Sequence, residues 1–404
     1  MKETDDSLRG IDGATFRFES GDATLVPAYV SPHVDVAAVT TRLKRLAQGR
    51  PVVAVSTAGE LCGDGTAPLY RPTGSRWSSV TLQIFPPDLI GAVSVHSVPL
   101  HNADIRAGAP TLPREERVER IVQSLGLVHP VFRVDARDVF ALAFIDGLSA
   151  CENCFTDAVY RTGRFPCLFI GGSAGGTFDF RDTYIFNGES IVQNHAVVLF
   201  EKVAEGRRYG AFKTQNFKKT GRSFSVADAD PDRRVVAGVI QPGNGDVTTF
   251  LEALASTFGI EIDGELFVRS LSGIDLHAGT ASFFCDVNPG DELLLLEATD
   301  FTEQTRRDLQ AFLKGKPKPL GAILNDCILR RLNNERALPA ATGLWPCPSA
   351  GFSTFGELFG IHVNQTLSAV MFFDTRAGNY TDAFYHRPRS STGAKWVRSS
   401  ATRA

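Results

Sequence analysis

The hydrophobic positions divide the chain into many short strands and a few amphipathic helices. Val36, Val39, Leu43 and Leu46 recur at helical spacing and predict a helix over residues 36–48. Further helices are predicted over residues 111–125, 152–160, 247–258 and 301–313. Ser149 and Glu152 have the spacing of a capping box at the start of the second of these. Apolar or alternating runs predict strands over 51–55, 80–84, 93–95, 138–145, 166–170, 183–186, 196–201, 320–324 and 367–373. Because strands and helices alternate irregularly, the predicted fold class is α+β or mixed α/β rather than one doubly wound sheet.

The chain length and one polar stretch predict two sheet-containing domains. At 404 residues the chain is long enough for two ordinary cores. The polar stretch 218–234 places the boundary between them. The predicted parts are an N-terminal extension 1–30, a first domain 31–228, a second domain 229–378 and a basic, disordered tail 379–404.

A short sequence occurs once in each predicted domain. The segment Ser56–Leu61 matches Ser353–Leu358 at five of six positions, and each follows a short apolar run. Since 297 residues separate the two copies, they are not a solenoid repeat. We therefore expect two similar loops, one from each domain, to face a shared cleft.

The composition is that of a globular protein without a nucleic-acid or membrane partner. Hydrophobic residues make up 43% and charged residues 22%, and the formal charge of −3 gives no basic field for nucleic acid. No apolar run approaches the length needed to cross a bilayer, and the first residues lack the apolar core of a signal peptide. The seven cysteines are scattered, which favours a reduced, cytoplasmic protein.

The glycine-rich segment 171–175 has the form G-x-S-x-G, which in α/β-hydrolases carries a nucleophilic serine between a strand and a helix. A strand is predicted before Ser173, but the residues after it read as extended rather than helical. The motif is therefore interpreted as a tight glycine turn, or as backbone N–H groups facing an anionic or carbonyl group of a ligand.

Cysteine and histidine spacing gives no preformed metal motif. Cys151 and Cys154 form a C-x-x-C at a predicted helix start, where redox or metal chemistry is possible, but no second pair accompanies them. We interpret them as ordinary helix cysteines. Of the eight histidines, His195 and His362 each precede an apolar strand, a suitable place for an iron-ligating imidazole. Cys347 is the thiolate alternative.

Several segments resemble those of a known family. Segments 52–60 and 169–175 resemble the two hallmark segments of the FIST N domain, and 350–357 with 364–366 resembles the FIST C domain. The resemblance extends from about residue 30 to 375 and implies a sensory, ligand-binding module of signal transduction, not an enzyme. Segments 194–198, 325–331 and 362–366 are similar to the stand-alone nitric-oxide-sensing NosP group. That likeness implies haem binding and control of a partner histidine kinase, often linked to biofilm formation.

The leading prediction is a cytoplasmic haem-binding sensor of nitric oxide or haem that regulates a histidine kinase, with a homo-oligomer as a possible assembly. The alternatives are a FIST sensor that binds a small metabolite such as an amino acid, and a hydrolase that uses Ser173. The predicted haem residues are the iron ligands His362 and His195, with Phe352, Phe355, Arg330 and Arg331 around them. The predicted ligand-binding residues are Ser56, Thr57, Glu60, Gly172, Ser173, Ser353, Thr354, Glu357, Asn364 and Thr366.

Overall fold

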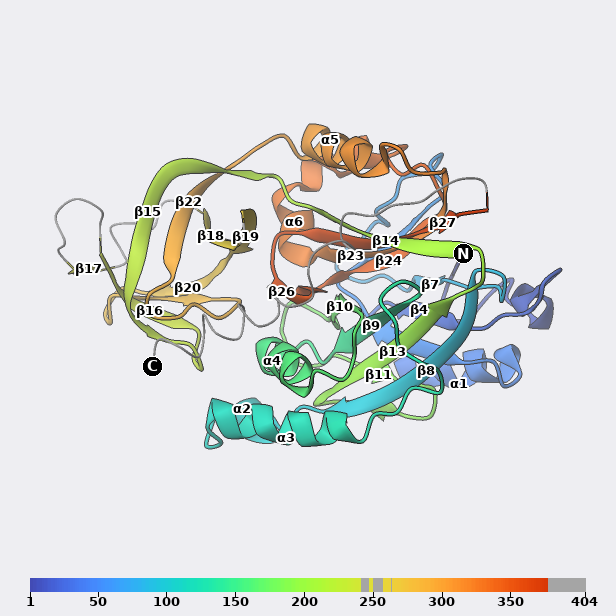
Figure 1. Ribbon diagram of the computed structural model, residues 1–404, viewed down its shortest axis with the longest axis horizontal. Helices are drawn as coiled ribbons and strands as arrows, with labels where there is room; N and C mark the ends of the chain where they lie inside the picture. The colour runs from blue at the N-terminus through green and yellow to red at the C-terminus, as the bar shows by residue number, and fades with distance from the viewer. Residues whose placement is uncertain (241–246, 250–256, 263, 377–404) are drawn as a thin grey trace.

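Three mixed sheets enclose a common core in the larger part of the computed structural model, and a fourth sheet lies beside them (Figure 1). The structure describes residues 1–240, 247–249, 257–262 and 264–376. Each of the three sheets contains a parallel pair of strands joined through a helix, with antiparallel strands on both sides. The fold is therefore α+β, as the sequence predicts.

Strands from distant parts of the chain lie side by side in each sheet. Across the first sheet the order is β1 (Lys2–Thr4), β7 (Val80–Leu82), β4 (Val26–Val30), β5 (Val52–Ser56), β11 (Ile185–Phe186) and β12 (Ile191–Val192). The second runs β26 (Ile361–Val363), β25 (Glu357–Phe359), β10 (Leu168–Ser173), β9 (Val139–Ile145), β13 (His195–Val203) and β8 (Ile90–Pro99). The third runs β14 (Arg207–Thr214), β27 (Leu367–Asp374), β23 (Pro319–Cys327), β24 (Ser349–Thr354) and β6 (Glu60–Gly63). A hairpin of β2 (Arg17–Phe18) and β3 (Gly21–Asp22) stands apart from these sheets.

These sheets are three copies of one repeat that exchange strands. The parallel pairs are β4 with β5, β9 with β10 and β23 with β24, and each pair is joined through a helix that lies between its strands in the chain. The strand that follows each pair leaves its own sheet and pairs with the next: β6 with β24, β11 with β5, and β25 with β10. This cyclic exchange gives the body an internal threefold repeat, so no single sheet is complete without a neighbouring repeat.

Helices cover the outer faces of the three sheets. They are α1 (Val36–Ala47), α2 (Ala103–Arg106), α3 (Arg114–Gly126), α4 (Glu152–Thr162), α5 (Phe301–Leu313) and α6 (Ile328–Asn333), with the 3-10 helices η1 (Gly13–Phe16) and η3 (Glu335–Ala341). The inner faces meet at aromatic side chains. The centre of the Phe352 ring lies 5.4 Å from the centre of the Tyr29 ring and 5.7 Å from that of the Phe144 ring. Because these three residues come from three different sheets, the central core depends on all three repeats.

The fourth sheet is inserted between β14 and α5. It comprises β15 (Phe217–Asp230), β16 (Val235–Ile240), β17 (Val247–Thr249), β18 (Thr257–Ile262), β19 (Glu265–Arg269), β20 (Leu271–Asp275), β21 (Thr280–Phe283) and β22 (Glu292–Ala298). It has its own apolar core, which includes Phe224, Phe258 and Phe283. We refer to residues 217–298 as the inserted sheet. In Figure 1 it lies to the left, beyond α4 and β26.

One predicted helix, in the region of the inserted sheet, was wrong at its described residues. The helix predicted over 247–258 is absent from its described residues, because 247–249 form β17 and 257–262 form β18; residues 250–256 lie outside the described residues. The apolar residues there include strand residues such as Phe258, which packs into the core of the inserted sheet. Tertiary packing decides this conformation, and the local hydrophobic pattern does not reveal it. The boundary predicted after residue 228 falls within β15.

The predicted tail 379–404 lies outside the described residues. Among the helices that the structure describes, none combines the length and the hydropathy that crossing a membrane requires.

Glu201 on β13 lies fully buried near the central core, and neither carboxylate oxygen has a hydrogen-bond partner. Burial raises its pKa to about 8, so the folded chain keeps a proton that the unfolded chain releases near pH 4.5. The folded state therefore loses stability as the pH rises from 4.5 to 8, by about 3 kcal/mol at pH 7.

We expect Glu201→Gln, which mimics the protonated carboxyl, to raise the urea midpoint at pH 7 and to flatten its pH dependence. Glu205→Gln, at an exposed position four residues later, is the matched control and should change little. If Glu201→Gln left the pH dependence of unfolding as it is in the native protein, the buried carboxyl would be ionised.

Candidate functional site

The three repeats meet at a ring of serines. Ser56, Ser173 and Ser353 occupy equivalent positions at the ends of β5, β10 and β24, and all are buried. The backbone carbonyl of each serine accepts a hydrogen bond from a backbone N–H of another repeat, two residues after that repeat's own serine. The N–H of Gly175 donates to Ser56 at 2.8 Å, that of Phe355 to Ser173 at 3.2 Å, and that of Ala58 to Ser353 at 2.9 Å. The sequence identified two of these three loops as similar, and the structure shows that Ser173 belongs to the third.

The two similar loops do meet, but as buried, hydrogen-bonded neighbours and not across an open cleft. Glu60 accepts hydrogen bonds from Thr57 at 2.6 Å, Ser79 at 2.5 Å and Trp77 at 3.1 Å, so its carboxylate holds its own loop. The equivalent Glu357 accepts a bond from Thr354 at 3.1 Å, and its Oε2 has no partner. Burial, followed by the charge of Asp326, raises the Glu357 pKa well above its usual range.

Arg330 and Arg331 are buried parts of the same framework. Arg330 pairs with Asp326 at 2.8 Å and donates to Thr305 and Tyr70. Arg331 donates to Ser353 Oγ at 3.1 Å and to the Arg71 carbonyl. Because their hydrogen-bonding groups are largely engaged within the protein, these arginines bind the loops of the first and third repeats together.

A second polar group joins the threefold body to the inserted sheet. Arg234, just before β16, donates to Glu152 Oε2 at 2.8 Å and to Asp286 Oδ1 at 3.0 Å. Ser173 Oγ donates to Glu152 Oε1 at 3.1 Å. His362 on β26 lies close enough for the charges of Glu152 and Arg234 to act on it. We call Glu152, Ser173, Arg234, Asp286 and His362 the junction cluster.

The carboxylates of the junction cluster are ionised despite their burial. Burial acts to raise the pKa of Glu152, but the Arg234 charge and hydrogen bond lower it overall. Asp286 behaves in the same way, with Arg234 and Arg114 as its counter-charges; Arg114 lies 2.6 Å from it. Arg234 holds this place with a left-handed backbone, φ 56°, which is uncommon for a residue other than glycine. Such strain persists where surrounding contacts determine the conformation.

His362 is the member of the cluster with unused hydrogen-bonding capacity. It is 3% exposed, and neither ring nitrogen has a partner. Burial lowers its pKa to about 4, so the imidazole is neutral near pH 7. Asn364, two residues along, also has an unpaired oxygen and nitrogen in its buried amide. Since most buried polar atoms have partners, the imidazole of His362 and the amide of Asn364 have unused hydrogen-bonding capacity.

The residues predicted to hold haem do not surround one site. The second sheet places β25, β10 and β9 between His362 on β26 and His195 on β13. Phe352 lies in the central core, whereas Phe355 packs on Phe180 with ring centres 5.2 Å apart. Arg330 is engaged with Asp326. Only the neutral, unpaired imidazole of His362 suits an iron atom, so the set as a whole does not fit a haem in this conformation.

The remaining predicted ligand residues are also buried. Gly172 lies against the third repeat, where an added Cβ would be 2.5 Å from Thr354 Cγ2. Thr366 donates to the Asn364 carbonyl at 2.9 Å. In the part of the chain that the structure describes, no three His, Cys, Asp or Glu side chains gather as a metal site would require.

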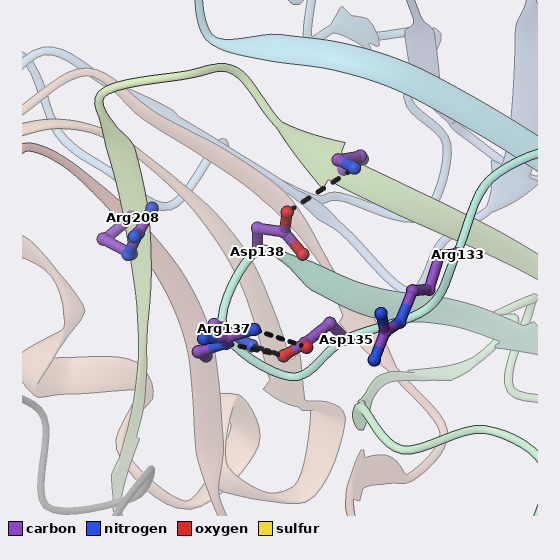
Figure 2. Close-up of a pocket in the computed structure, with 6 residues that line it drawn as sticks. Arg133, Asp135, Arg137, Asp138 and Arg208 are labelled. Carbon is purple, nitrogen blue, oxygen red and sulfur yellow. Dashed lines mark hydrogen bonds and ion pairs between the residues drawn. The ribbon is translucent and has the colours of Figure 1, made fainter.

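Two surface hollows lie away from the junction cluster. One, of about 300 Å³, is lined entirely by charged residues, and Figure 2 shows Arg137 paired with Asp135 and an ion pair on Asp138. The other, of about 870 Å³, lies beside the end of α1 and includes Lys44, Arg50 and His96. The predicted site residues line neither of these hollows.

Three residues of the cluster were missed by sequence reasoning. The sequence suggested that Glu152 closes a capping box with Ser149, but Ser149 Oγ accepts from Cys151 N–H, and Glu152 instead contacts Ser173 and Arg234. Arg234 and Asp286 carry no motif, and they reach the site only because the inserted sheet lies against α4. The sequence signal that could have identified Glu152 was its position as an acidic residue at the start of a predicted helix.

We expect Ser173→Ala to lower the free energy of unfolding by about 1–2 kcal/mol, because it removes a hydrogen bond to a buried carboxylate. Ser97→Ala, at an exposed position on β8, is the control. We expect neither protein to hydrolyse an ester such as p-nitrophenyl acetate beyond the background rate. Esterase activity in the native protein that disappeared in Ser173→Ala would instead identify Ser173 as a nucleophile.

Two family models match the chain in agreement with this architecture. Residues 24–238 match the FIST N domain and residues 234–360 match the FIST C domain. The first match spans the first two repeats, and the second spans most of the inserted sheet and much of the third repeat. No curated protein matches the chain. FIST domains are sensory modules of signal transduction. The chain belongs to the FIST family.

Proposed function

We propose that this protein is a cytoplasmic sensor whose ligand binds at the junction cluster, between the threefold body and the inserted sheet. The observation that carries the proposal is the buried imidazole of His362, whose nitrogens lack partners and which feels fixed charges of both signs. Two residues further along the chain, the buried amide of Asn364 also lacks partners. A ligand that formed hydrogen bonds with these atoms would remove the free-energy cost of leaving them buried without partners.

The charges favour a small zwitterionic metabolite such as an amino acid. All three nitrogens of Arg234 are engaged in this structure, so the ligand would bind an arrangement in which Arg234 is released from Glu152. There Arg234 would bind a ligand carboxylate and Glu152 its ammonium group, each in a charge-assisted hydrogen bond. Arg269 of β19, whose Nε has no partner, acts electrostatically on His362 and adds a second cation. Both cations belong to the inserted sheet or its edge, so ligand binding would change how tightly that sheet is held against α4.

This arrangement gives the sensor a physical output. A ligand shifts the balance between two arrangements only by binding one more tightly. Here the two arrangements would differ in the contact of Arg234 with Glu152, and therefore in the position of the inserted sheet. We propose that a partner histidine kinase responds to that position.

The test is thermal stabilisation of the full chain by a panel of free amino acids, with matched amines and carboxylic acids that carry only one of the two charges. A ligand at 100 times its Kd should add about 2.7 kcal/mol to the unfolding free energy. Asn364→Leu should raise the Kd of the ligand at least tenfold, whereas Asn187→Ala, in the larger surface hollow, should leave the Kd unchanged. Equal stabilisation of the two variants would place the ligand elsewhere.

Haem, and nitric oxide bound to it, is the second candidate, favoured by one observation: the neutral imidazole of His362 with both nitrogens unpaired. Titration with haem should then give a Soret band that shifts in His362→Ala and not in His33→Ala. An unchanged spectrum in His362→Ala would remove that residue as the iron ligand.

A further inference from the structure

Cys151 and Cys154 lie three residues apart at the start of α4. Cys151 immediately precedes the helix and Cys154 lies in its first turn, so the side chains share one face. Neither cysteine is in a disulfide, and both side chains pack in the same buried apolar cluster. Residues three apart on a helix have Cβ atoms about 5–6 Å apart, and a disulfide needs about 3.5–4.5 Å. A small movement of this first turn is therefore enough to bridge the pair.

The surroundings make the two cysteines chemically different. The hydrogen bond from Cys151, assisted by the charge of Arg114, lowers the pKa of Cys154. The same hydrogen bond, together with burial, raises the pKa of Cys151. Cys154 is therefore the more acidic of the two thiols and the candidate nucleophile, and Cys151 is the candidate resolving thiol. Cys151 is 0% and Cys154 5% exposed, so a small oxidant can reach the pair more readily than a protein can.

We propose that Cys151 and Cys154 form a reversible disulfide, with a hydroperoxide such as hydrogen peroxide as the oxidant, and that this bond regulates the junction cluster. The Cys154 thiolate attacks one peroxide oxygen and forms a sulfenic acid, while the O–O bond breaks and hydroxide leaves and takes up a proton. The Cys151 sulfur then attacks the Cys154 sulfur and loses its proton, the S–S bond forms, and a second water leaves. Two thiols are oxidised by two electrons and one peroxide is reduced to two waters.

The regulatory part follows from the position of Glu152 between the two cysteines. Glu152 begins α4, accepts a hydrogen bond from Ser173 and pairs with Arg234. A disulfide closed across this residue fixes the first turn of α4 in a new geometry, because an S–S bond is about 2 Å long and two free thiols cannot approach each other that closely. The oxidised protein should then hold Arg234, and the inserted sheet, differently. This second part rests on the proposed function, whereas disulfide formation does not.

The first experiment counts thiols in the native full chain after mild peroxide treatment, by alkylation after denaturation and mass spectrometry. We expect two of the seven thiols to be lost, one peptide linkage between Cys151 and Cys154, and full recovery with dithiothreitol. Cys151→Ser should stop at a sulfenic acid on Cys154 that dimedone traps, and Cys154→Ser should resist oxidation. Cys167→Ser is the control and should behave like the native protein. Oxidation of other cysteines before this pair, or a pair that stays reduced while Cys167 reacts, would overturn the disulfide.

The second experiment compares ligand stabilisation of the reduced and oxidised forms, with the amino acid that gives the largest shift. We expect oxidation to change its Kd at least threefold in the native chain and not in Cys151→Ser. If the disulfide forms and the Kd is the same in both forms, the regulatory link is wrong although the disulfide stands. If no amino acid binds, hydrogen exchange at α4 before and after oxidation tests the same link, and unchanged exchange would overturn it.

Discussion

Gly175→Ala should prevent the protein from folding. Gly175 lies where the loops of the three repeats meet, and its N–H donates to the Ser56 carbonyl. An added Cβ would lie 2.2 Å from Ala58 N, 2.5 Å from Thr57 C and 3.0 Å from Ser353 O. These are backbone atoms in two other loops, so they cannot rotate away as a flexible side chain would. We expect a loss of about 4 kcal/mol or more in unfolding free energy, a size found where a substitution overpacks a core.

Gly126→Ala, in the last turn of α3, is the matched control. Its added Cβ would have only Arg164 Nη1 within reach, at 4.0 Å, and alanine favours a helix by about 1 kcal/mol over glycine. Soluble yield, circular dichroism and the unfolding midpoint distinguish the two variants. A soluble Gly175→Ala protein with the native midpoint would show that the three loops do not pack as described.

Arg234→Met should lower the free energy of unfolding by about 3–5 kcal/mol, since it removes the shared counter-charge of two buried carboxylates. Glu152 would keep its hydrogen bond from Ser173, and Asp286 would keep its ion pair with Arg114. The paired variant with Glu152→Gln should recover part of the loss, because one uncompensated charge is then absent.

Arg233→Met is the control one residue away. The Arg233 side chain is 75% exposed and lies 3.7 Å from Asp230, so its loss should change stability by less than about 0.5 kcal/mol. Urea unfolding at pH 7 measures all of these variants. Equal midpoints for the Arg233 and Arg234 variants would mean that the inserted sheet is not held by the junction cluster.

The sequence reveals the repeat only where its residue types coincide. Ser56–Leu61 and Ser353–Leu358 share their glycine and glutamate, so two of the three loops were recognised. The loop after Ser173 keeps the glycine, as Gly176, but has Thr177 where the others have a glutamate. Its sequence similarity to the other two loops is therefore too low to show that it is equivalent. The equivalence is visible in hydrogen bonds between loops that lie more than 100 residues apart in the chain.

The candidate site was harder to predict than the fold class. His362 and Ser173 were identified from the residues around them, but their common neighbour Glu152 was interpreted as a helix cap. Arg234 and Asp286 depend on where the inserted sheet lies, which hydrophobic periodicity does not encode. The helix predicted over 247–258 was wrong at its described residues for the same reason, because strand pairing within the inserted sheet decides their conformation.

Hydrogen–deuterium exchange, with and without the amino acid that stabilises the protein most, tests the junction cluster as the sensory site most directly. We expect the ligand to change exchange in the first turn of α4, in residues 284–286 and in residues 361–366, which together surround the junction cluster. Residues 41–53 and 187–189, beside the larger surface hollow, should be unaffected. A change confined to those hollow residues would contradict the junction cluster as the sensory site, and the absence of any stabilising amino acid would contradict a zwitterionic ligand.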